Sequence, residues 1–188
     1  MKRILGPATA FFPTPCVLVV SGDMNLANII MVAWAGIVNA EPPMLAISMR
    51  PQTHAYAQVK RYGEFTVNIA HEGMLQQVDV CAMMTGITSD KFAYAKLTKL
   101  PSKKVTPPIV GESLVSLECE VHETHPLGSH ELVIGEIVQV HMDEAILDEQ
   151  GEITTERRKL VVCCPPMREF RAVGERLELY GFSQRKTG

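Results

Sequence analysis

Short runs of apolar residues, each followed by a turn signal, predict that this chain is built mainly from short β-strands. Residues 17–20 form a β-branched run before a Ser-Gly-Asp turn. A longer apolar and β-rich segment covers residues 28–38, and a further apolar strand is expected over residues 44–49. Between these two, Pro42 and Pro43 are expected to leave the sheet, because proline cannot donate a ladder hydrogen bond.

The second half of the chain shows the same β character over longer stretches. Residues 114–121 alternate between two sides, one of which carries Ser and Glu, and this predicts a half-buried strand with one solvent-facing side. Residues 127–130 form a turn, and residues 131–142 return as a long strand. A further strand is expected over residues 160–163, followed by a tail of mixed character.

Three short helices are predicted in the first half. Thr53 suits the N-cap of a helix over residues 54–61, which ends before Gly63. Helical spacing of apolar residues predicts a second helix over 74–84, and a third begins near Asp90. Many strands with few helices favour a mainly β fold, a closed barrel with helical decorations. A doubly wound α/β sheet needs regular alternation of strands with long helices, which this chain lacks.

Composition narrows the class of protein further. The 188 residues and 20.8 kDa fit one domain spanning residues 1–188, and 46% of the residues are apolar. A net charge of −3 argues against broad nucleic-acid binding. The longest apolar stretch, residues 29–38, is about half the length of a membrane span. Prolines between residues 7 and 15 interrupt any signal peptide, so we expect a cytoplasmic protein that does not enter the membrane.

The cysteines and the glycines exclude several kinds of site. The five cysteines are odd in number and lack C-x-x-C spacing, so we expect small buried side chains in a reducing compartment, with no disulfide or structural zinc. His122 and His125 would point to opposite faces of a strand, which disfavours a metal site. No two glycines lie two positions apart, so the dinucleotide fingerprint G-x-G-x-x-G is absent, as are the Walker and G-x-S-x-G motifs.

A candidate anion site lies where a predicted strand runs into the first helix. Arg50 carries a planar cation suited to phosphate, Ser48 and Thr53 add hydroxyl donors, and His54 lies in the first helical turn. The alternative is an ordinary strand–turn–helix join with a surface arginine. Lys91, at the start of the third helix, is a second candidate, and the alternative there is a solvated lysine.

A candidate slot for a flat aromatic group lies in residues 28–35. This segment is apolar and contains the only tryptophan, Trp34. An apolar strand edge with backbone groups along it is what a planar cofactor needs. The alternative is that Trp34 is an ordinary core residue.

Five groups of residues, in order along the chain, follow a known pattern. They are residues 28–35, Glu41-Pro42-Pro43 with residues 47–51, residues 63–68 (GEFTVN), Asp90-Lys91-Phe92, and Gly128-Ser129-His130 with residues 134–137. Together they resemble the flavin reductase-like family with the FMN-binding split-barrel fold, and within it the flavoredoxin branch. The similarity covers residues from about 13 to about 181.

The resemblance implies a Greek-key split β-barrel that forms a homodimer and binds one FMN tightly per subunit. In the family pattern, phosphate contacts come from the strand–helix join and Lys91, the flavin ring lies along the 28–34 strand, and His130 reaches the flavin from a hairpin. The expected cofactor-binding residues are Asn28, Val32, Ala33, Trp34, Ser48, Met49, Arg50, Thr53, His54, Lys91 and His130. No catalytic side chain and no metal ligand is expected.

The resemblance also implies a reaction, namely hydride transfer to the flavin from NAD(P)H that binds transiently. No acid or base is needed for that step, and His130 is the one candidate for proton handling. Two alternatives stay open. The protein could be an electron carrier that serves a redox protein partner without NAD(P)H turnover, or a flavin- or haem-binding module without turnover.

Overall fold

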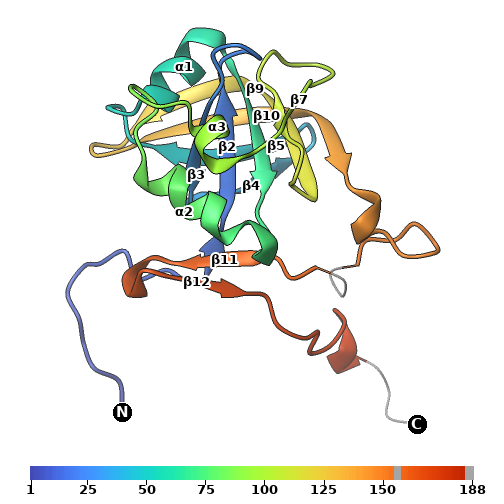
Figure 1. Ribbon diagram of the computed structural model, residues 1–188. Coiled ribbons are helices and arrows are strands. Elements are labelled where there is room, and N and C mark those ends of the chain that lie inside the picture. Colours follow the sequence, from blue (N-terminus) through green and yellow to red (C-terminus); the bar gives the residue numbers. More distant parts are fainter. Residues whose placement is uncertain (155–157, 185–188) are drawn as a thin grey trace.

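The computed structural model describes residues 1–154 and 158–184, and its main element is a seven-stranded antiparallel sheet (Figure 1). In spatial order the strands are β3 (Asn28–Val32), β2 (Val17–Ser21), β6 (Glu64–Ile69), β9 (Val115–Pro126), β10 (Glu131–Met142), β5 (Pro43–Met49) and β4 (Ala35–Ala40). The sheet curls so that β3 comes close to β5, and the backbone N–H of Ser48 donates to the carbonyl of Trp34 at 2.9 Å. The mainly β expectation is confirmed.

Both faces of the central strands are buried, which explains their continuous apolar runs. In β2, Val17 and Val19 point into the barrel interior, where they join Phe65, whereas Leu18 and Val20 face an outer cluster. A strand covered on both sides does not need polar residues at alternate positions. The β-branched run is therefore what this location requires.

Three α-helices lie in the described part of the chain. They are α1 (His54–Tyr62), α2 (Leu75–Met83) and α3 (Lys91–Ala95). Thr53 caps α1, and Gly63 ends it with a left-handed φ of 69°, as the sequence predicts. Phe92 of α3 and Val78 of α2 belong to the outer cluster with Leu18.

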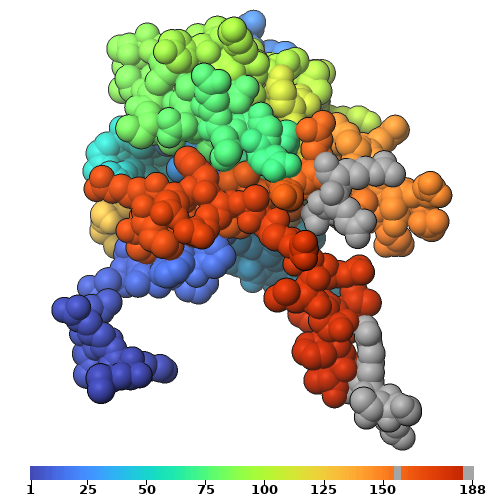
Figure 2. Space-filling model, turned by 60° about the horizontal axis from the view of Figure 1, so that its bottom comes forward, coloured from blue at the N-terminus to red at the C-terminus, as the bar shows by residue number. Residues whose placement is uncertain are grey.

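Shorter elements surround the barrel. One small sheet contains β1 (Thr14–Pro15), β11 (Val161–Cys164) and β12 (Glu169–Ala172). Another pairs β7 (Lys99–Leu100) with β8 (Ile109–Val110). The 3₁₀ turns in the described residues are η1 (Glu72–Met74), η2 (Glu144–Ile146), η3 (Pro165–Met167) and η4 (Phe182–Gln184). In the space-filling view, the N-terminal and C-terminal segments extend from the body as two arms (Figure 2). Among the described residues, no helix combines the length and apolar character needed to cross a bilayer.

The β segment expected over residues 28–38 is two strands, because β3 ends at Val32 and β4 starts at Ala35. These strands lie at opposite ends of the sheet order, so the chain must leave one edge and cross to the other. The break at residues 33–34 makes that crossing. The prediction for Pro43 was wrong: it is the first residue of β5 and lies opposite Ala40, a position where a missing N–H is tolerated.

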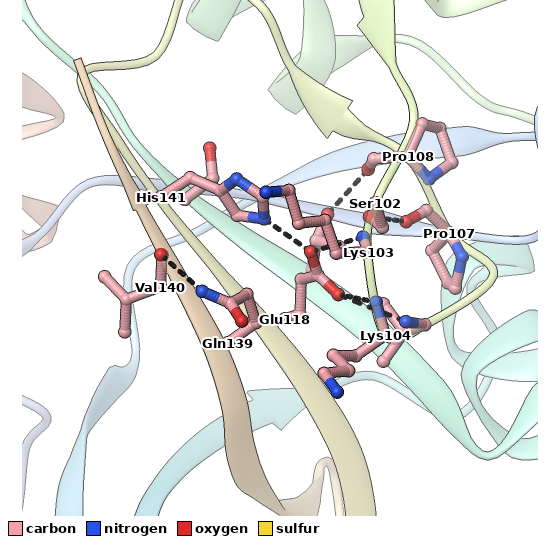
Figure 3. A network of polar contacts seen from close by, with 12 residues as sticks. Ser102, Lys103, Lys104, Pro107, Pro108, Glu118, Gln139, Val140 and His141 are labelled. Carbon is pink, nitrogen blue, oxygen red and sulfur yellow. Dashed lines mark hydrogen bonds and ion pairs between the residues drawn. The ribbon is translucent and has the colours of Figure 1, made fainter.

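The solvent-facing side expected for residues 114–121 was also wrong, because Ser116 and Glu118 are buried. The side chain of Glu118 is 0% exposed. Its carboxylate accepts backbone N–H bonds from Lys103 (2.7 Å), Lys104 (2.6 Å) and Val105 (3.1 Å), and it also contacts the His141 ring (Figure 3). The segment that bends over β9 brings its own amides to the acidic residue, so burial leaves the carboxylate satisfied.

All five cysteines are buried with free thiols, which confirms their expected role as small apolar side chains.

Candidate functional site

Three adjoining cavities gather at one side of the barrel, where β3, β5, α1, α2 and the β9–β10 hairpin meet. The cavity that residues of β3 and β5 line, which we call the main cavity, has a volume of about 440 Å³. A recess of about 260 Å³ lies at the start of α1, between β3 and the segment after α2. A mouth pocket of about 570 Å³ lies toward the hairpin. Thr53 lines all three, so together they form one continuous site.

The main cavity has mostly apolar walls. Strand β3 supplies Met31 and Val32, α2 supplies Ala82, and Pro165 closes the side toward β11. Ala33 and Trp34 follow at the break between β3 and β4, so their backbone groups run along the cavity without belonging to a strand. An apolar slot edged by backbone polar groups suits a flat heteroaromatic ring.

Trp34 and His130 line one edge of the main cavity, and His130 also lines the mouth pocket. Their ring centroids lie 4.8 Å apart, with the planes tilted by 45°. The Ser129 hydroxyl and Nδ1 of His130 are 2.9 Å apart and hydrogen-bonded. Burial lowers the pKa of His130, and the nearby charge of Arg50 lowers it further. This edge therefore presents an uncharged aromatic pair at neutral pH.

The start of α1 supplies donors to the recess. The Thr53 hydroxyl donates to the carbonyl of Arg50 at 2.9 Å and accepts from the N–H of Tyr56 at 3.3 Å, which fixes the turn that leads into the helix. The hydroxyl is thus used within the protein. His54 and Ala55 follow in the first turn and line the recess. Backbone N–H groups at this end of a helix lack intrahelical acceptors, and the helix dipole adds partial positive charge.

Lys91 is a buried cation in the recess. Its side chain is 4% exposed, and Nζ donates to the carbonyl of Cys81, near the end of α2, at 3.1 Å. Burial lowers the pKa of Lys91. Within residues 1–154 and 158–184, no carboxylate forms an ion pair with it. A buried ammonium with only a carbonyl partner is costly, and an anion in the recess would relieve that cost.

Arg50 does not line the same cavity as Lys91. It lines the main cavity and the mouth pocket, whereas Lys91 and His54 line the recess. In the described part of the chain, no carboxylate pairs with Arg50 either. The cations that the sequence assigns to one phosphate cradle are therefore divided between two cavities.

Every residue expected at the cofactor site lines one of the three cavities. Eight line the main cavity, namely Val32, Ala33, Trp34, Ser48, Met49, Arg50, Thr53 and His130, and the recess adds Asn28, His54 and Lys91.

Sequence reasoning missed the residues that close the site from elsewhere, including Ala82, Pro165 and the segment 83–87. Only Gly86 carries a local signal. A Cβ atom on it would lie 2.0 Å from Oδ1 of Asn28, so a close backbone approach requires glycine there.

The donor set and the cavity shapes fit a flavin mononucleotide. The apolar main cavity can accept a tricyclic ring, and the recess next to it offers one buried cation and a helix N-terminus for a single phosphate group.

Comparison with known proteins agrees with this fit. The structure superposes on flavoredoxin of Desulfovibrio vulgaris (Miyazaki F) with a TM-score of 0.91 and 34% identity, covering 98% of this chain and 100% of the other. Flavoredoxin from Methanosarcina acetivorans has the same fold, with a TM-score of 0.88, 24% identity and 98% of both chains covered. An uncharacterised protein of Pyrococcus abyssi is 30% identical over 68% of this chain and 73% of its own length.

Residues 9–160 match the family described as "Flavin reductase like domain". The match spans most of the chain, including β3, the join between β5 and α1, Lys91 and His130. The fold is also that of a protein with a split barrel domain from Shewanella frigidimarina, with a TM-score of 0.76, 20% identity, and 88% of this chain and 85% of the other covered, which confirms the expected split-barrel relationship. The chain therefore belongs to the flavin reductase-like family.

Proposed function

We propose that this protein is an FMN-binding oxidoreductase in which the flavin ring occupies the main cavity and the phosphate occupies the recess. The observation that carries the proposal is Lys91, a buried lysine without a carboxylate partner among the described residues, which lies beside the first turn of α1. Such a cation calls for an anionic ligand. The family match and the 34% identity to a flavoredoxin support a flavin as that ligand.

The recess favours FMN over FAD. Asn28 and Gly86 both line it and lie so close together that a Cβ atom on Gly86 would be 2.0 Å from Oδ1 of Asn28. Lys91 and the first turn of α1 offer donors for one phosphate group, and a recess of about 260 Å³ leaves little volume for an adenosine extension beside it. Riboflavin, which lacks the phosphate, is expected to bind more weakly than FMN.

A bound flavin would supply the redox chemistry by accepting a hydride, with its two electrons, from NAD(P)H. The protein's part is to hold the ring and to limit access to it. Met31 of β3 and Ala82 of α2 line the walls of the cavity, and Trp34 and His130 lie at its open edge. His130 is the proposed proton-handling residue, because its lowered pKa keeps the ring neutral and able to accept a proton near pH 7.

Anaerobic mixing tests this function directly. The FMN-loaded protein is combined with NADH or NADPH, and bleaching of the flavin absorbance is followed with time. Rapid bleaching with either nucleotide supports the reductase function. Absence of bleaching with both nucleotides, together with reduction by a redox protein, would favour the electron carrier instead.

We also propose that two copies of the chain associate through β4 and the terminal arms. Strand β4 is an edge strand, and its Ile37 and Val38 side chains are 64% and 54% exposed. The C-terminal arm adds the exposed Leu177 and Leu179. Apolar edge strands need a partner to avoid uncontrolled pairing. Light scattering should give a mass about twice the 20.8 kDa of the chain, and a mass of one chain would contradict the proposal.

A further inference from the structure

Arg50 is placed for a ligand other than the flavin phosphate. Its side chain lines the mouth pocket and the main cavity, but it does not line the recess that contains Lys91. No carboxylate among residues 1–154 and 158–184 pairs with it, so its guanidinium can accept an external anion. The phosphate in the proposed binding mode already has Lys91 and the start of α1.

The mouth pocket has the chemistry of an anion site. Besides Arg50 it is lined by Gln52, Thr53, Ser129 and His130, and none of these side chains is acidic. The Gln52 amide and the Arg50 guanidinium are hydrogen-bond donors in the lining of this pocket, and guanidinium matches phosphate oxygens with two parallel hydrogen bonds. Because the charge of Arg50 depresses the pKa of His130, the field of Arg50 reaches across this pocket.

The position of the pocket limits what its ligand can be. Arg50, Thr53 and His130 line both the mouth pocket and the main cavity, so the two adjoin at these residues, and Trp34 lies against His130 on the side of the main cavity. A ligand held by Arg50 therefore has one end beside the proposed flavin ring and its anion in the mouth pocket. A dinucleotide hydride donor has this form, because its nicotinamide ring is joined to a pyrophosphate.

We propose that the mouth pocket is a second anion subsite in which Arg50 binds the pyrophosphate of the dinucleotide hydride donor. The inference rests on the proposed flavin reductase function and assigns the two cations different tasks. Lys91 serves the cofactor, and Arg50 serves the second substrate. The nicotinamide then lies at the open edge next to Trp34 without any dinucleotide-binding fold.

The test compares Arg50→Gln with Arg61→Gln, a matched control at the other end of α1. FMN affinity is measured first. The FMN-loaded proteins are then titrated with ADP-ribose, which carries the pyrophosphate but cannot donate a hydride. Finally, flavin bleaching is followed with NADH and with 1-methyl-1,4-dihydronicotinamide, a hydride donor without phosphate.

In Arg50→Gln we expect FMN affinity to change less than threefold and ADP-ribose affinity to fall at least tenfold. The NADH concentration for half-maximal bleaching rate should rise at least tenfold, whereas the rate for the phosphate-free donor should change less than threefold. Arg61→Gln should match the wild type throughout.

Two results would overturn the inference. One is a tenfold loss of FMN affinity in Arg50→Gln with ADP-ribose binding unchanged, which would assign Arg50 to the cofactor. The other is a wild-type protein that does not bind ADP-ribose. Failure of both donors to bleach the flavin would instead refute the reductase function, and loss of ADP-ribose binding in Arg50→Gln would still support the anion subsite.

Discussion

The imidazole of His130 lies against the indole of Trp34, with 4.8 Å between the ring centroids and a tilt of 45°. The two residues come from segments far apart in the sequence, since Trp34 follows β3 and His130 ends the turn between β9 and β10. Their contact closes one edge of the main cavity. It also holds a titratable ring next to Arg50, which makes the site sensitive to pH.

His130 should therefore titrate below the ordinary histidine value of about 6.5. Burial is the larger cause of the lowered pKa and Arg50 the smaller, so Arg50→Gln should move the pKa part of the way back up. NMR titration of the His130 ring protons measures this. Arg61→Gln is the control, and an identical His130 pKa in both variants would contradict the assigned cause.

The lowered pKa of His130 should also make the free energy of unfolding depend on pH. The unfolded chain binds a proton at His130 more readily than the folded one, so the stabilising contribution of His130 is fully present above about pH 6.5. It is lost as the pH falls through the lower, folded value. Urea unfolding at a series of pH values should show this loss in the wild type and less of it in His130→Gln.

Glu118→Gln should destabilise the protein by about 2–4 kcal/mol, because an amide cannot accept from all three backbone N–H groups and keep its contact with His141. Glu120→Gln, at an exposed position on the same strand, is the control. Urea unfolding midpoints give the difference, and equal midpoints in the two variants would refute a structural role for the carboxylate.

The stability that Glu118 contributes should also depend on pH. Burial alone would raise the pKa of Glu118, but the backbone N–H bonds and His141 outweigh it and lower the pKa below the ordinary glutamate range. This carboxylate therefore adds stability above its unfolded pKa and loses that effect as the pH falls through the folded value. The acid-unfolding curve of Glu118→Gln should be shallower than that of the wild type.

Gly135→Ala should cost about 1–3 kcal/mol through overpacking. A Cβ atom there would lie 2.6 Å from Cζ of Phe65, which is fully buried in the barrel interior. Gly36→Ala on β4 meets no atom within 4 Å and is the matched control. Thermal unfolding of the two variants provides the measurement, and equal melting temperatures would show that the interior can adjust around Gly135.

Lys91→Met should weaken FMN binding by about 1.5–3 kcal/mol, the range for a hydrogen bond to a charged group. Riboflavin affinity should be unchanged, because riboflavin has no phosphate for Lys91 to bind. Without flavin the variant should be at least as stable as the wild type, since a buried ammonium without an anion is unfavourable. Lys96→Met, just after α3, is the control, and equal losses for FMN and riboflavin would contradict the phosphate role.

The sequence predicted the helices and strands well wherever the local signal matched the location in the fold. Thr53 and Gly63 mark α1 because capping is a local property. Glu118 was misplaced because its burial depends on backbone amides at residues 103–105, which fold over it from a separate segment. The alternation of residues along β9 does not indicate that a separate segment covers the strand.

In the candidate site too, some features could be predicted from local sequence and others depend on tertiary packing. The expected residues converge because the family motifs lie at strand and helix ends that the barrel brings together. Sequence reasoning could not separate Arg50 from Lys91, because a list of donors near one helix start contains no distances. Their assignment to different cavities emerges only when β5, α1 and α3 are packed against each other.

The single tryptophan offers the most direct test of whether FMN occupies the main cavity. Trp34 is the only source of indole fluorescence in the chain and lines that cavity. Titration of flavin-free protein with FMN should quench the Trp34 emission in a saturable way, with an end point of one FMN per chain. Emission that stays constant while free FMN accumulates would contradict the central claim.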